Sequence, residues 1–295
     1  EQDPFTGKTD GILRKARQAK SVPKIMHIQT SADYWGRGGS LVHVDPTGTR
    51  DAVLPPEVRV YAIGGAEHFP GDDFTLIRAG GQFPRNPTDY RPIARALLVA
   101  LDAWVRDEVP PPPSVYPRIA DGALVDWQAS NSGWRALPGV RYPEVIHSPE
   151  SLDFGPDFAS KGILSKHPPA RRGTHRVLVP AYFKDGNERG MLRLPSVAVP
   201  VATYLGWNLR SRGVGAENEL LDLRGSHIPF AQTPERREAF GDPRPALLER
   251  YRDFEDYLSR YRAALRELVA ERCMLPEDAG LLLRRAERRR ALFDR

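Results

Sequence analysis

Two short apolar runs set the strongest constraint on the fold of this chain. They occupy residues 24–28 and 58–63, and each is followed by a polar loop that contains glycine. A short helix over residues 10–20, which Asp10 can cap, precedes them, and apolar residues at steps of three and four predict a further helix over residues 89–107. Helices that alternate with short apolar strands favour an α/β sheet with parallel strands.

Proline marks where this regular pattern ends. The chain has 28 prolines among 295 residues, about twice the ordinary usage, and four of them stand together at 110–113. Such a run is stiff and extended and is typical of a boundary between regions. We therefore divide the chain into an α/β part at residues 1–109, a Pro-rich wrapping region at residues 110–240 and a helical region at residues 241–295.

The two later regions contain fewer clear elements. Residues 176–179 and 190–194 flank an Asp-Gly-Asn turn and predict a β-hairpin. Leucines and aromatic residues at helical spacing predict one long core-facing helix over residues 243–271, and Pro276 opens a last helix. Cys273, the single cysteine, excludes an internal disulfide and is expected to be a small, unreactive helix residue.

Composition and charge exclude several classes of protein. No run approaches the roughly 18 apolar residues of a membrane helix, so we expect no membrane partner. The net charge of +5 is concentrated in residues 284–295, which contain six arginines and two acidic residues. The basic side of a terminal helix is usually exposed to solvent. We therefore expect no nucleic-acid partner. No targeting signal is visible in the first thirty residues, and the sequence does not indicate a compartment.

One histidine stands where a general base is often found. Gly64 and Gly65 end the second apolar run sharply, and Ala66, Glu67 and His68 follow in a loop. Loops beyond the carboxyl ends of parallel strands line the crevice of such sheets, so His68 is a candidate base. The alternative is a histidine that only hydrogen-bonds its own loop.

The loop after the first apolar run supplies a partner for that histidine. Asp33 can accept a hydrogen bond from one imidazole nitrogen and leave the other facing a nucleophile, as the acid of a hydrolytic triad does. The alternative for Asp33 is to cap a helix that begins near Tyr34. Glu67 is a poorer candidate, because adjacent residues in an extended loop point apart.

These segments together resemble a bacterial family of α/β-hydrolases described only as alpha/beta hydrolase domain-containing. The resemblance begins with residues 24–43, 45–48 and 58–68. It continues through residues 86–87, 94–107, 110–117, 120–122, 206–210 and 228–231 and so covers nearly the whole chain.

The resemblance implies a fold and roles for two residues. The two apolar runs correspond to the last two strands of the α/β-hydrolase sheet, so the chain is expected to be the C-terminal part of that fold, followed by the Pro-rich, hairpin-containing and helical regions. His68 takes the position of the catalytic base and Asp33 that of the orienting acid. The implied activity is hydrolysis of a small-molecule ester.

The nucleophile that this resemblance requires is missing from the sequence. No G-x-S-x-G pentapeptide occurs, and Ser31, Ser40 and Ser132 stand in no such motif. An oxyanion-hole run of the His-Gly-Gly-Gly type is also absent. We expect that an upstream segment or a companion chain supplies the serine; the rival interpretation is a catalytically inactive remnant that serves as a binding or assembly module.

The remaining polar residues give no further site. His27, His43, His147, His167, His175 and His227 lack metal-ligand spacing and are expected to be surface or hydrogen-bonded histidines. Asp72 and Asp73 could bind a cation, although a solvated turn is the simpler interpretation. We expect neither a metal nor a cofactor.

Overall fold

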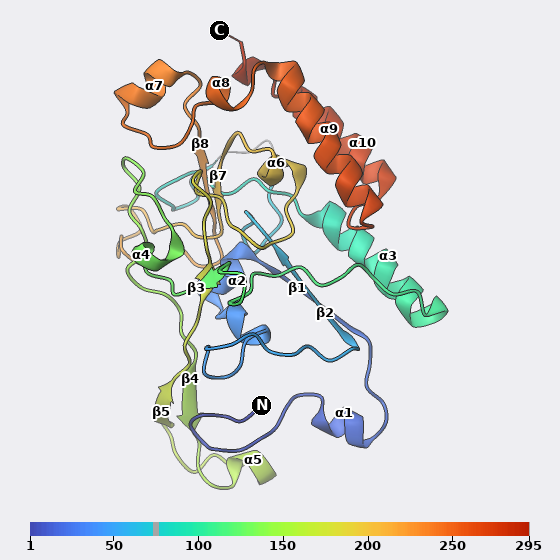
Figure 1. Cartoon of the computed structure of the whole chain (residues 1–295). Coiled ribbons are helices and arrows are strands. Elements are labelled where there is room, and N and C mark those ends of the chain that lie inside the picture. Colours follow the sequence, from blue (N-terminus) through green and yellow to red (C-terminus); the bar gives the residue numbers. More distant parts are fainter. Residues whose placement is uncertain (73–76, 295) are drawn as a thin grey trace.

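A pair of parallel strands lies at the centre of the computed structural model, which describes residues 1–72 and 77–294. Strand β1 (Ile25–Thr30) lies beside β2 (Val58–Ile63) in Figure 1. The two strands pair in parallel, with Ile25 opposite Val58 and Thr30 opposite Ile63. The parallel pairing expected from the sequence is therefore present, and both strands direct their carboxyl ends to the same edge.

Two later segments lie along the free side of β2. The amide of Ala62 donates to the carbonyl of Val115 at 2.8 Å, and the amide of Leu192 donates to the carbonyl of Ala62 at 2.8 Å. The first of these segments directly follows the proline run, whose residues lack the amide hydrogens of a central strand. The Pro-rich region thus lies against β2 rather than apart from it.

Three long helices cover one side of this sheet. Helix α3 (Arg91–Asp107) follows β2, and α9 (Phe254–Ala270) and α10 (Pro276–Glu287) lie beside each other near α3 in Figure 1. Their buried residues share one hydrophobic cluster with β2, which includes Tyr61, Leu97, Leu192, Leu265 and Leu282. This cluster combines residues from 1–109, 110–240 and 241–295.

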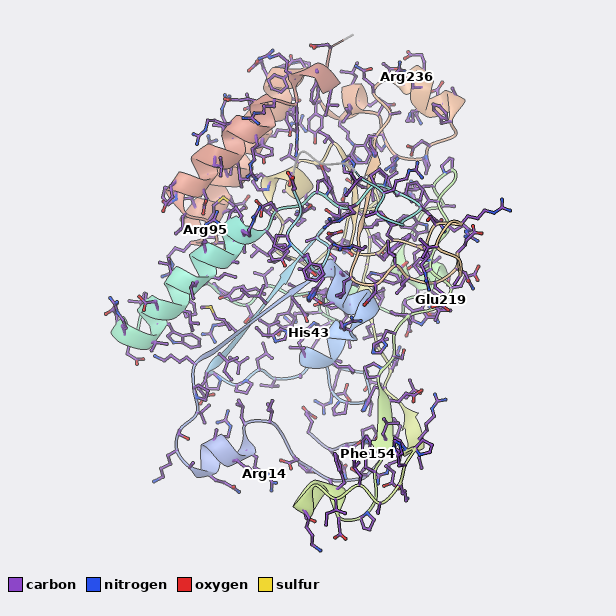
Figure 2. All side chains as sticks on the ribbon, turned by 180° about the vertical axis from the view of Figure 1, so that it is seen from behind. Arg14, His43, Arg95, Phe154, Glu219 and Arg236 are labelled. Carbon is purple, nitrogen blue, oxygen red and sulfur yellow. The ribbon has the colours of Figure 1, made fainter. Side chains whose placement is uncertain are left out.

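An ion pair joins two of these helices. Arg95 of α3, labelled in Figure 2, places its Nε 3.0 Å from Oδ2 of Asp278 in the first turn of α10. Pro276 occupies the first turn of α10, as the sequence predicts.

A second hydrophobic cluster surrounds the short helix α2 (Ser31–Gly36), which begins directly after β1. Trp35 packs near Tyr142 and Trp207 with ring centroids 5.7 Å and 5.9 Å away. His43 is buried beside α2 (Figure 2), with its Nε2 2.8 Å from the Tyr34 hydroxyl.

The remaining elements are short and lie around these two clusters. Strands β3 (Leu124–Val125) and β6 (Val179–Pro180), β4 (Glu150–Asp153) and β5 (Ala170–Thr174), and β7 (Ala202–Leu205) and β8 (Ser226–Pro229) form three antiparallel pairs. The short helices are α1 (Arg14–Gln18), η1 (Gly39–Val42), α4 (Ala129–Ser132), α5 (Phe158–Lys161), α6 (Pro195–Ala198), α7 (Pro234–Ala239), α8 (Leu247–Arg250) and η2 (Arg290–Leu292).

The predicted hairpin has different partners from those expected. A short hairpin closes around the predicted turn, since Tyr182 and Glu188 form an antiparallel bridge and the amide of Phe183 donates to the carbonyl of Asn187 at 2.8 Å. However, Val179 pairs with Val125, and Leu192 pairs with Ile63. The prediction that residues 176–179 and 190–194 pair with each other is wrong, because each segment pairs with a more distant strand.

Three helix predictions also need correction. The long helix expected over residues 243–271 is interrupted at Tyr251, whose backbone is extended, and α9 begins anew after Asp253, whose side chain accepts from the Asp256 amide at 2.8 Å. The first helix begins at Arg14 rather than at residue 10. Cys273 is buried in the turn between α9 and α10 rather than in a helix.

Among the described residues, no helix is both long enough and apolar enough to cross a membrane. Asp73, half of the acidic pair considered above, lies outside the described residues.

Candidate active site

The side chain of Asp33 is fixed by the first turn of α2. Thr30 precedes this helix, and its amide and hydroxyl both donate to Oδ2 of Asp33, at 2.7 Å and 3.0 Å. An acid three residues after a helix-capping threonine commonly makes this contact. The helix begins at Ser31, so Asp33 lies within its first turn and does not precede the helix.

The other oxygen of this carboxylate reaches His68. Oδ1 of Asp33 lies 2.8 Å from Nδ1 of His68, and the two side chains are 14% and 41% exposed, respectively. One oxygen of Asp33 therefore contacts the helix-capping Thr30 and the other contacts the imidazole. The prediction that Asp33 itself caps a helix beginning near Tyr34 is wrong, because the helix begins at Ser31 and Thr30 is its capping residue.

This contact determines which imidazole nitrogen is available. A carboxylate accepts a hydrogen bond from Nδ1–H, so in the neutral ring Nδ1 keeps its proton and Nε2 carries the lone pair. No side chain among the described residues hydrogen-bonds to that Nε2. The half-exposed ring also packs edge-on against Phe69, with centroids 5.0 Å apart.

The backbone that carries His68 is held at several points. The amide of Gly64 donates to the carbonyl of Leu192 at 2.9 Å, and the amide of His68 donates to the carbonyl of Leu223 at 3.3 Å. The Tyr90 hydroxyl donates to the His68 carbonyl. These contacts from separate parts of the chain restrict the positions that the imidazole can occupy.

Asn86 adds a further constraint. Its Nδ2 donates to the carbonyls of Gly65 at 2.9 Å and Leu205 at 3.0 Å, and its side chain is buried. It thereby connects the loop after β2 to the end of β7.

Glu67 points into a different set of contacts. Its side chain is fully buried, and its carboxylate pairs with Arg85 and Arg224 and accepts from the amide of Gly225 at 3.1 Å. These partners balance its charge. Although Glu67 is adjacent to His68 in sequence, its side chain stabilises the loop around Gly225.

A second buried glutamate connects the ends of β1 and β2. Oε2 of Glu188 accepts from the Ser31 hydroxyl, at the start of α2, and from the amide of Gly65 at 3.1 Å. Burial raises the pKa of Glu188 to about 7. The other oxygen, Oε1, has no hydrogen-bond partner among the described residues.

The serines considered from the sequence do not reach His68. The Ser31 hydroxyl is bound to Glu188, the Ser40 hydroxyl accepts from the amide of Leu178 at 2.9 Å, and the Ser132 hydroxyl accepts from Tyr142 at 3.0 Å. All three side chains are buried. In the described structure these three serine hydroxyls are therefore bound to other partners than His68.

The other histidines have varied surroundings. His147 and His167 are exposed, and His43 is hydrogen-bonded, as expected. His227 differs from the expectation, because it is buried and its Nδ1 has no hydrogen-bond partner in the described part of the chain. Within residues 1–72 and 77–294, no three side chains of histidine, cysteine, aspartate or glutamate form a group that could hold a metal ion.

Several supporting residues were not identified from the sequence. Thr30 could have been found, because a threonine three residues before an acid is a helix-start pattern. Glu188 gives no such signal, since it is 157 positions from Ser31 and 123 from Gly65. Tyr90 and Asn86 also act on backbone that only the fold brings near them.

Comparison with known proteins gives one match. A family model described as "Alpha/beta hydrolase domain" matches residues 2–284. No curated protein and no solved structure was found to match the chain.

Proposed function

Because the chain belongs to the alpha/beta hydrolase domain family, we propose that it contributes the base and the acid of a serine-dependent carboxylic-ester hydrolase. The observation that carries the proposal is the 2.8 Å contact between Asp33 and His68 at the carboxyl ends of two parallel strands. Family membership supports a hydrolase, and the contact supports this particular pair.

In the proposed reaction His68 acts through Nε2. It takes the proton of the serine hydroxyl as the serine oxygen attacks the ester carbonyl, and the imidazolium then gives that proton to the leaving alcohol. A water molecule then takes the place of the serine hydroxyl: His68 accepts the proton of the water as the water attacks the acyl group on the serine. The carboxylic acid and the free serine are released. Asp33 stabilises the imidazolium and keeps the ring oriented.

The serine itself comes from outside the described chain in this proposal. An upstream segment or a companion polypeptide would place it opposite Nε2 of His68. Mass measurement of the protein isolated from its source tests this part directly, because the chain alone has a mass of 33.0 kDa. A longer polypeptide or a bound companion is expected, and a species of only that mass would contradict the arrangement.

Hydrolysis of a short, uncharged chromogenic ester by the natively isolated protein tests the catalytic proposal. We expect His68→Ala to lower kcat/KM roughly 1,000-fold or more, because the base is lost. His147→Ala is the matched control, since His147 is an exposed histidine remote in sequence from the pair. Equal rates for the two variants would refute a catalytic role for His68.

A second candidate function rests on the missing serine motif. A chain without a nucleophile can act as a binding or assembly module, as catalytically inactive members of enzyme families do. This alternative predicts no turnover of the ester even when the upstream segment or companion is present.

A further inference from the structure

A basic cavity lies between β8 and the end of α10, apart from Asp33 and His68. It encloses about 370 Å³, and Arg285, Arg288, Arg289 and His227 are among its lining residues. A volume of a few hundred Å³ is within the range of small-molecule sites. Arg285 lies in the last turn of α10, and Arg288 and Arg289 follow in the turn between α10 and η2.

Arg289 is the cation whose surroundings matter most. Its Nη1 donates to the Tyr257 hydroxyl at 3.0 Å, and no carboxylate of the described residues lies within ion-pair distance of its guanidinium. By contrast, Arg285 pairs with Asp89 at 3.2 Å. A partly buried guanidinium that lacks an acidic partner is stabilised when an anion binds beside it.

His227 supplies a second polar group to the same cavity. The residue is 8% exposed, its sealed Nδ1 has no hydrogen-bond partner among the described residues, and its ring lies 5.3 Å from that of Tyr204. Because Nδ1 is buried, Nε2 is the ring nitrogen that can contact a molecule in the cavity. Burial, aided by Arg289 and Arg244, lowers the pKa of His227 to about 4, so the ring is neutral at neutral pH.

Apart from Tyr204, the rest of the cavity wall is apolar. Val201, Phe230, Leu247 and Leu292 line it, so an inorganic ion would leave most of the wall without contact. A neighbouring cavity of about 490 Å³ shares Phe230, Leu247 and Leu292 and is also lined by Arg236 of α7, labelled in Figure 2. The apolar space therefore continues beyond the arginines.

We propose that this cavity binds an amphipathic organic anion. Its carboxylate or phosphate group would contact Arg288 and Arg289 and accept a hydrogen bond from Nε2 of His227, and its apolar part would lie against Phe230 and Leu247. This site is separate from the proposed hydrolytic pair, because neither Asp33 nor His68 lines the cavity.

Isothermal titration of the full chain with octanoate tests the proposal. Octanoate is expected to bind with a Kd below about 1 mM. Octylamine lacks the anionic group and inorganic phosphate lacks the apolar part, so each is expected to bind at least about 10-fold more weakly. Failure of octanoate to bind, or equal binding of octylamine or inorganic phosphate, would overturn the proposal.

Two variants and one control assign binding to the cavity. Arg289→Gln removes the positive charge, and His227→Phe removes the ring nitrogen that would donate to the anion. Each variant is therefore expected to weaken octanoate binding about 10-fold. Arg284→Gln removes an exposed arginine of α10 that does not line the cavity, and this variant is expected to bind octanoate as the wild type does. His227→Phe keeps an aromatic ring in place, so it remains informative where Arg289→Gln disturbs folding. Equal affinities in His227→Phe, Arg284→Gln and wild type would contradict the assignment.

Discussion

The substitution Glu188→Gln tests the buried link between the two strand ends. Glu188 is fully buried and accepts hydrogen bonds from Ser31 and Gly65. Glutamine keeps the size of the side chain and one accepting oxygen, and it removes the titrating group. The variant therefore isolates the effect of ionising this carboxyl.

The expected magnitude follows from the raised pKa of Glu188. Its ordinary pKa is 4.5, and burial raises it to about 7 in the folded chain. Between these values the folded state holds a proton that the unfolded state has released, so stability falls as pH rises. At about 1.4 kcal/mol for each pH unit, ionising Glu188 lowers the free energy of unfolding by about 3 kcal/mol between pH 4 and pH 8.

Urea unfolding followed by tryptophan fluorescence measures this effect. Other groups titrate in the same range, so the relevant quantity is the free energy of unfolding of the wild type minus that of Glu188→Gln at each pH. We expect this difference to fall by about 3 kcal/mol from pH 4 to pH 8. A difference that stays constant across the range would refute the view that burial raises the pKa of Glu188 in the folded chain.

Three further predictions concern stability and thiol reactivity. Gly206→Ala is expected to lower the free energy of unfolding by about 2 kcal/mol in the same assay, because a Cβ there would lie 2.6 Å from the backbone nitrogen of Ala32, and an unchanged value would contradict the close approach. Glu67→Gln is expected to lower the free energy of unfolding by about 3 kcal/mol, because Arg85 and Arg224 lose a fully buried partner. Glu255→Gln is the control: Glu255 forms an exposed pair with Arg290, so the free energy of unfolding should stay within about 0.5 kcal/mol of the wild-type value. Equal effects of the two substitutions would contradict this difference. Cys273 is buried and burial raises its pKa to about 11, so Ellman's reagent is expected to label it only after unfolding, and rapid labelling of the folded chain would show that the thiol is accessible.

Local patterns in the sequence predicted the centre of the fold. The apolar runs became β1 and β2 in parallel, helical spacing located α3 to within a few residues, and Pro276 marked the start of α10. The positions of Asp33 and His68 could also be anticipated, because each follows the carboxyl end of one of these strands. Parallel pairing brings such positions to one edge.

Long-range contacts account for what the sequence did not reveal. The strand partners of Val179 and Leu192 depend on residues far along the chain, and local turn signals cannot specify them. Glu188 reaches Ser31 across 157 positions for the same reason. The break at Tyr251 escaped detection because apolar periodicity continues through it, while Asp253 restarts the helix.

Nitrogen-15 NMR of the imidazole ring tests the central claim, that Asp33 holds His68 with Nε2 available as a base. The spectrum is recorded near pH 9, where an ordinary imidazole is neutral, and the His68 signals are assigned by their absence from His68→Ala. In the wild type the structure predicts a protonated Nδ1 and an unprotonated Nε2. In Asp33→Asn we expect this preference to be lost, because a neutral amide replaces the carboxylate that accepts the hydrogen bond from Nδ1–H. A proton on Nε2 in the wild type, or identical spectra for wild type and Asp33→Asn, would contradict it.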